Sequence, residues 1–238
     1  MRLLALETAT EYCSVALLTV AADGQVSMHS VGRHAPRLQT ELILPMVDEL
    51  LQQTSMSLAS CDAIAYSAGP GAFTGVRIAA SVAQGLAFAS DLPVVAVSSL
   101  QAQAQGVARL HGASAAVSCF DARMQEIYLG AYQLDANGLM QPLADEVVCR
   151  PNEAPELLCT AWANHTSAGV AAGSGWLTYG DELSAQLAVT QRYLDAMPEA
   201  QDVARLALPM VLAGAAKAPE HALPVYLRDD VWKKLPGR

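Results

Sequence analysis

The chain has 238 residues, of which 53% are hydrophobic and 5% aromatic, and its formal net charge is −9. This length and hydrophobicity exclude a disordered chain and predict a globular protein with one large domain or two small ones. The acidic balance excludes strong nucleic-acid binding by the chain alone, because that affinity comes mainly from Lys and Arg on phosphates.

The first half of the chain predicts strands and helices in the order βββαβαβα, in which three antiparallel strands precede the first helix. The strands are expected at residues 2–6, 12–20, 25–31, 63–66 and 93–97, and the helices at 40–53, 74–89 and 98–110. A meander followed by alternating helix and strand is the repeating half of actin-like and ribonuclease-H-like folds, and it predicts a mixed sheet.

A second, eroded copy of this order begins near residue 115. Its strands are expected at residues 115–120, 126–134, 146–150 and 170–172, and its helices at 151–160 and 199–217. Residues 183–197 show no clear pattern. We therefore predict an α/β fold of two actin-like lobes with mixed sheets. The predicted lobes span residues 1–110, completed by the helix within 199–217, and residues 111–198, with a tail over 218–238.

A glycine-rich turn joins the predicted strand at residues 63–66 to the long helix behind it. Gly69, Pro70 and Gly71 break the apolar pattern, and Thr74 is a good N-cap for the helix. Free amides of such a turn, with Arg77 nearby, can bind an anion. The alternative is that the glycines only make a tight connection, since the turn has neither the Lys-Ser/Thr of a P-loop nor the spacing GxGxxG.

The scattered cysteines and the short apolar runs predict the cellular compartment of the protein. The five cysteines form no C-x-x-C pair, which fits a reducing compartment and small core residues rather than disulfides. The first apolar run is too short for a secretory signal, and the run near Leu206 falls short of the ~20 residues that span a bilayer. These features predict a cytoplasmic protein without a membrane contact.

Five segments, taken in order, resemble the TsaB (YeaZ) family over nearly the whole chain. The segments are LETAT at residues 6–10, ELILPMVDELL at 41–51, AGPGAFTGVRIAASVAQGLA at 68–87, DARMQEIYLGAY at 121–132 and PVYLRDD at 224–230. The resemblance implies an actin-like fold of the ASKHA class. It also implies a role in adding threonylcarbamoyl to the adenosine beside the anticodon of tRNAs that read codons beginning with A.

The same resemblance implies a division of labour. In that family the paralogue TsaD carries out the transfer and TsaE is the ATPase partner, whereas TsaB is a subunit that TsaD requires. The chain is therefore expected to form a heterodimer with TsaD, to lack a catalytic centre and to meet tRNA only through the complex. TsaD-type proteins hold a metal with an H-x-x-x-H pair, and none of the five histidines here has such a partner. We expect no metal and no cofactor of its own.

Eight residues are candidates for a vestigial nucleotide cleft, which is expected to bind ATP or ADP weakly at most. They are Glu7, Thr8, Thr10, Gly69, Gly71, Thr74, Arg77 and Asp121. The first turn carries an acid and two hydroxyls, whereas the second, at Asp121, has the acid without the glycines. The alternative function is a stand-alone actin-like ATPase or phosphotransferase, which would use these residues and the Gly173–Gly175 turn.

Two predicted helices carry more apolar surface than a single buried stripe needs, and this surface predicts a partner interface. Under the resemblance, these helices pair with the matching helices of TsaD; in its absence the same surface could pair with a second copy. The interface candidates are Leu42, Met46, Leu50, Val76, Ala79, Ala80 and Ala83.

Overall fold

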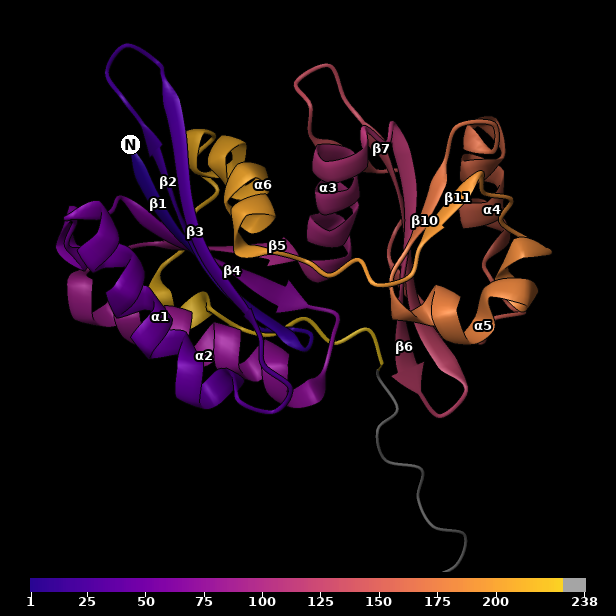
Figure 1. The fold of residues 1–238 in the computed structure, drawn as a ribbon, viewed down its shortest axis with the longest axis horizontal. Coiled ribbons are helices and arrows are strands. Elements are labelled where there is room, and N and C mark those ends of the chain that lie inside the picture. Colours follow the sequence, from indigo (N-terminus) through magenta and orange to yellow (C-terminus); the bar gives the residue numbers. More distant parts are fainter. Residues whose placement is uncertain (229–238) are drawn as a thin grey trace, which may run out of the picture.

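The computed structural model describes residues 1–228 and shows two lobes side by side (Figure 1). The first half of the chain contains β1 (Arg2–Glu7), β2 (Tyr12–Val20), β3 (Val26–His34), α1 (Gln39–Thr54), β4 (Ala63–Gly69), α2 (Phe73–Ser90), β5 (Val94–Ser98) and α3 (Ser99–His111). The second half contains β6 (Ala115–Arg123), β7 (Glu126–Leu134), β8 (Met140–Pro142), β9 (Val147–Cys149), α4 (Glu156–Trp162), β10 (Val170–Ala172), α5 (Ser174–Ser184), β11 (Gln191–Tyr193) and α6 (Ala200–Leu212).

Both sheets have the same topology, so the two lobes are related. The first sheet has the strand order β3-β2-β1-β4-β5, and the second has the order β8-β7-β6-β10-β11, with β9 also pairing with β7. In the first sheet β1 is antiparallel to β2 and parallel to β4, and in the second sheet β6 is antiparallel to β7 and parallel to β10. This arrangement confirms the predicted α/β fold with two mixed sheets of the actin-like class.

The first sheet is covered by helices on both faces because its strands bury alternate residues in opposite directions. Leu4 and Leu6 of β1 belong to a core shared with α1 and α2, whereas Leu3 and Ala5 belong to a core shared with α6. Figure 1 shows α1 and α2 below this sheet and α6 above it. The chain thus returns to its first lobe after it has completed the second.

Helix α3 lies between the two lobes and packs on the second sheet. It begins at the N-cap Ser98, whose hydroxyl accepts a hydrogen bond from the Gln101 amide. Its buried residues Leu100, Ala104 and Val107 join Phe120 and other residues of the second sheet in one core, while α4 and α5 cover the opposite face. The predicted division after residue 110 therefore separates α3 from the sheet on which it packs.

Several predicted boundaries are wrong, and the causes are local. Strand β3 continues to His34 because it pairs with β2 along its whole length, so the predicted loop from Gly32 starts too early. Helix α2 begins at Phe73 after Ala72, so Thr74 lies in the first turn instead of capping it. The prediction omitted β8, α5 and β11, which are short or weakly patterned. The last ten residues of the predicted tail lie outside the described part. None of the helices described over residues 1–228 is long and apolar enough to cross a membrane.

Candidate functional site: the cleft between the lobes

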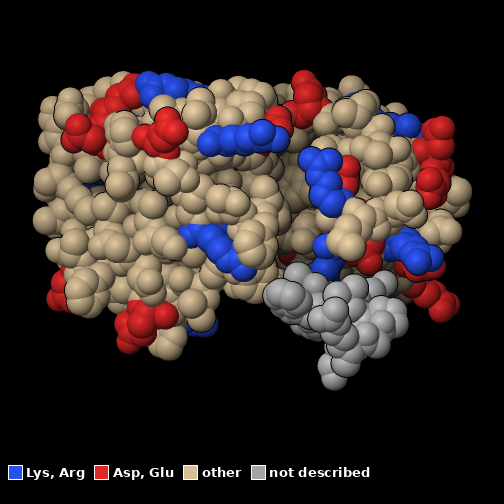
Figure 2. Space-filling view, turned by 90° about the horizontal axis from the view of Figure 1, so that it is seen from below, with Lys and Arg blue, Asp and Glu red and all other residues tan. Residues whose placement is uncertain are grey.

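A cleft of about 870 Å³ lies between the two lobes, a volume that could hold a small-molecule ligand. Its walls are built from the β1–β2 turn, the start of α2, the β6–β7 hairpin, α5 and the C-terminal segment that ends at Arg228. Seen from below in Figure 2, the surface is hollowed where the lobes meet, and Lys or Arg side chains lie on both sides of the hollow. Of the eight predicted cleft residues, Thr10, Gly71, Arg77 and Asp121 line it.

The glycine turn packs directly against the β1–β2 turn. The Ala72 amide donates to the Ala9 carbonyl at 2.8 Å. The Thr8 hydroxyl donates to the Gly75 carbonyl at 2.7 Å. A Cβ on Gly71 would lie 2.7 Å from the Ala9 oxygen, and one on Gly75 would overlap the Thr8 oxygen. These glycines therefore permit close contact between two turns, and the Thr8 hydroxyl is used in that contact instead of facing the cleft.

Glu7 is fully buried behind this turn and does not line the cleft. One carboxyl oxygen accepts a hydrogen bond from the Ala9 amide at 2.5 Å, and the other has no hydrogen-bond partner. Burial raises the pKa of the Glu7 carboxyl to about 7. The side chain is folded back onto its own turn, so in this structure it does not face the cleft.

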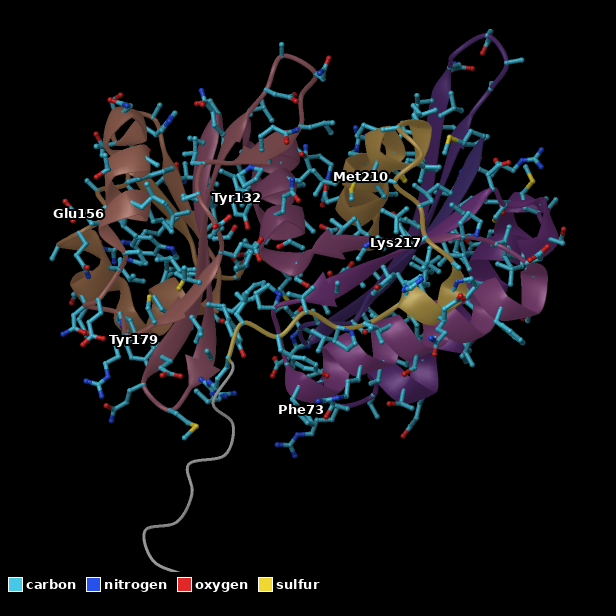
Figure 3. All side chains as sticks on the ribbon, turned by 180° about the vertical axis from the view of Figure 1, so that it is seen from behind. Phe73, Tyr132, Glu156, Tyr179, Met210 and Lys217 are labelled. Carbon is cyan, nitrogen blue, oxygen red and sulfur yellow. The ribbon has the colours of Figure 1, made fainter. Side chains whose placement is uncertain are left out.

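The remaining first-lobe candidates surround the start of α2. The Arg77 guanidinium lies 3.2 Å from the centroid of the Phe73 ring and 5.0 Å from that of Tyr226, so two aromatic rings already hold it. Figure 3 shows Phe73 at the lower end of α2. Gly69 has a φ of +107° and lies beneath the Val225 carbonyl, and Thr74 is exposed outside the cleft lining, so neither reaches a ligand there.

The β6–β7 hairpin contributes the second predicted turn, and its backbone is strained. Arg123, Met124 and Gln125 have φ values of 63°, 57° and 62°, a left-handed conformation that costs a non-glycine residue about 1 kcal/mol. Asp121 stabilises this turn by accepting a hydrogen bond from the Arg123 amide at 2.7 Å and by pairing with the Arg123 guanidinium at 3.5 Å. Asp121 therefore lies in the cleft wall but is engaged within its own hairpin.

Six of the seven residues predicted for the partner interface are buried in the core, so in the free chain they present no exposed surface. They are Met46, Leu50, Val76, Ala79, Ala80 and Ala83; Leu42 is partly exposed. The apolar stripe of an amphipathic helix marks the side that packs on its own sheet. The excess width is explained because α1 and α2 also pack against each other and against the C-terminal segment.

The C-terminal segment is the part of the site that sequence reasoning missed. Val225, Tyr226, Leu227 and Arg228 all line the cleft, although this stretch was noted only as part of the resemblance. No periodic pattern marks it, because it is neither a helix nor a strand. Over residues 1–228 the structure contains no group of three or more His, Cys, Asp and Glu residues that could hold a metal ion.

Comparisons with known proteins bear on this geometry. A family model described as "TsaD: tRNA N6-adenosine threonylcarbamoyltransferase" matches residues 31–174. The protein named tRNA threonylcarbamoyladenosine biosynthesis protein TsaB from Escherichia coli K12 is 42% identical over the full length of both chains. Its namesake from Haemophilus influenzae is 38% identical over 100% of this chain and 98% of its own. The solved structure of YeaZ from Pseudomonas aeruginosa is 41% identical, with a TM-score of 0.83 over 95% of this chain and 99% of that one.

Proposed function

The chain belongs to the TsaB family of tRNA threonylcarbamoyladenosine biosynthesis proteins, and from this premise we propose that it is a non-catalytic subunit that binds and activates TsaD. With TsaD and TsaE it would support transfer of threonylcarbamoyl to the adenosine beside the anticodon of tRNAs reading codons that begin with A. In this proposal the heterodimer with TsaD works in the cytoplasm, and tRNA is met only through the complex.

The state of the cleft is the observation that supports a non-catalytic role. Glu7 is buried and turned away, and the Ala72 amide is bonded to the facing turn. Bulky left-handed residues stand where a phosphate-binding turn would need glycine. A subunit with such a cleft is better suited to bind a partner protein than to catalyse a reaction. The same observations count against the alternative of a stand-alone ATPase.

The exposed side of α2 is a better candidate for the TsaD contact than the buried residues considered first. Ile78, Val82 and Leu86 are partly exposed, and Gly85 lies on the surface between them. A Cβ on Gly85 would meet no atom within 4 Å, so this position has open space in the free chain. Small and apolar residues at helical spacing allow a partner helix to approach closely. On the neighbouring helix α1, Leu44 is 49% exposed.

Replacing Gly85 with arginine tests this proposal. Gly85→Arg is expected to leave the folded chain intact, because the site is open and arginine is a better helix former than glycine. It should weaken TsaD binding at least tenfold, about 1.4 kcal/mol, because a long charged side chain would hold the helices apart. Calorimetric titration with purified TsaD measures the affinity, and threonylcarbamoyl transfer in the reconstituted mixture measures the consequence.

The control is Ala213→Arg, which adds the same charge at an exposed position after α6, on the opposite face of the first sheet. It should bind TsaD normally. Normal binding by Gly85→Arg would show that the assigned face is wrong. Transfer that proceeds without this chain, or ATP hydrolysis by the chain alone, would contradict the activating role. The same face is expected to pair with a second copy when TsaD is absent, and Gly85→Arg should then make the chain monomeric.

A further inference from the structure

Residues 222–228, which we name the strap, connect the first lobe to the second across the mouth of the cleft. In Figure 3 the yellow chain after Lys217 runs across the first lobe, above the helix that begins at Phe73, and ends beside the second sheet. Four consecutive strap residues, Val225 to Arg228, line the cleft. The strap is therefore a wall of the cleft as well as a link between its two sides.

Contacts with α2 and β4 fix the first-lobe end of the strap. Just before it, the Gln84 side chain on α2 donates to the Pro219 carbonyl at 3.1 Å. Within it, Ala222 is buried in the core shared with α1 and α2. The Tyr66 hydroxyl donates to the Leu223 carbonyl at 3.1 Å, and the Val225 amide donates to the Ala68 carbonyl at 2.8 Å. The hydrogen bonds of the strap itself therefore go to β4, which leads into α2. The strap meets α2 through the packing of Ala222 and through the Arg77 guanidinium, 5.0 Å from the centroid of the Tyr226 ring.

Arg228 fixes the second-lobe end of the strap, at the strained β6–β7 turn. Its guanidinium donates to the Ala122 carbonyl at 3.2 Å on one side of the turn and forms an ion pair with Glu126 on the other. It also lies 3.8 Å from the Met124 sulfur. The Arg228 side chain thus contacts both β6 and β7, on either side of the turn that contains the left-handed residues. A turn that holds strain needs such external contacts to keep one conformation.

We propose that the strap is a conformational device: Arg228 latches the β6–β7 turn and the cleft in one arrangement, and the strap couples that arrangement to the outer face of α2. A partner bound to α2 would then act on the turn and the cleft without touching either. The latch is a property of the free chain. The coupling to a partner rests on the proposed function. The two parts are tested separately.

Hydrogen exchange of the full-length chain tests the latch. Arg228→Gln removes the positive charge and leaves fewer hydrogen-bond donors than the guanidinium has, but it keeps a polar side chain at this position. Amides within residues 119–128 and 222–227 should exchange at least tenfold faster, and the rest of the molecule should be unchanged. Glu126→Gln removes the other half of the ion pair and should accelerate the same two segments. The control Arg150→Gln breaks an exposed ion pair with Glu153 in the same lobe and should change neither.

Unchanged exchange in both Arg228→Gln and Glu126→Gln would overturn the latch, and so would acceleration spread over the whole molecule. The coupling is tested by adding TsaD. In the unmodified chain bound TsaD should slow exchange within residues 119–128, and in Arg228→Gln this protection should be lost although TsaD still binds. If TsaD binds the unmodified chain and leaves this segment unchanged, the coupling is wrong and the proposed function stands. If TsaD does not bind, the proposed function itself fails.

Discussion

Replacing Arg109 with alanine is expected to lower the free energy of unfolding by about 3–5 kcal/mol, because it leaves a buried carboxylate without a partner. Arg109 on α3 donates to both oxygens of Asp202 on α6, at 2.9 and 2.7 Å, and to Glu199 at 3.0 Å. The Asp202 side chain has no solvent exposure, and the hydrogen bonds that Arg109 donates to it raise the pKa of Arg109 above its usual range. Gly106 on α3 lets the two helices come this close.

Urea denaturation at neutral pH measures this effect, with three comparison variants. Arg109→Lys keeps the charge but loses the paired hydrogen bonds, so its loss should be smaller. The double variant Arg109→Met with Asp202→Leu removes both charges together and should recover most of the stability. Arg205 is an exposed arginine on α6, the helix that carries Asp202. Arg205→Ala should therefore change stability by less than about 0.5 kcal/mol. A loss below about 1 kcal/mol for Arg109→Ala would contradict the assignment of a buried, charged pair.

The Arg109–Asp202 pair shows what the sequence could not reveal. Its two residues are 93 positions apart, and neither stands in a motif. The elements that could be predicted are those with local signals, and β2, β7 and β10 were predicted at their observed bounds. The repeated order of strands and helices was enough to predict two related lobes. The pairing between distant helices depends on packing that no local pattern records.

The sequence indicates which turns line the cleft, but not which of their side chains face it. Hydroxyl, acidic and glycine residues pointed to the β1–β2 turn, the glycine turn and the β6–β7 turn, and the structure does bring these three turns to one cleft. What each residue does there depends on which side of the backbone it faces. Thr8 and Glu7 face inward, whereas Thr10 faces the cleft. Residue type and spacing carry no information about that direction in a turn.

The same limit applies to the residues predicted for the partner surface, most of which are buried in the free chain. Apolar residues at helical spacing identify one face of a helix, but they do not say whether a sheet or another protein covers it. Ala80 and Ala83 are covered by the chain's own sheet and neighbouring helix. Gly85 was not considered, because glycine in a helix carries no apolar signal. Its value as a surface marker comes from the open space around it, which only the folded structure shows.

The second large effect that we expect is a pH dependence of the free energy of unfolding, caused by Glu7. Burial raises the pKa of its carboxyl from 4.5 to about 7, so between these values the folded chain keeps a proton that the unfolded chain releases. The free energy of unfolding must therefore fall as pH rises through this window and level off above pH 7. The full loss is on the order of 3 kcal/mol. The stabilising state is the protonated one.

Glu7→Gln isolates this contribution because glutamine cannot titrate and still offers an oxygen to the Ala9 amide. The variant and the unmodified chain should have similar stability near pH 4.5. By pH 8 the variant should be more stable by about 3 kcal/mol. Urea denaturation of both chains at several pH values gives this difference, in which the other titrating groups cancel.

Glu11→Gln is the matched control, since Glu11 follows the same turn but its side chain is 66% exposed. Its stability should track that of the unmodified chain at every pH. Parallel curves for Glu7→Gln and the unmodified chain would mean that Glu7 ionises in the folded state near its ordinary pKa, which requires water or a cation to reach it. That outcome would support the alternative that Glu7 contributes a negative charge to a ligand site in the cleft. A gap that grows between pH 4.5 and pH 7 would show instead that the acid of the first turn now serves the fold and not a ligand.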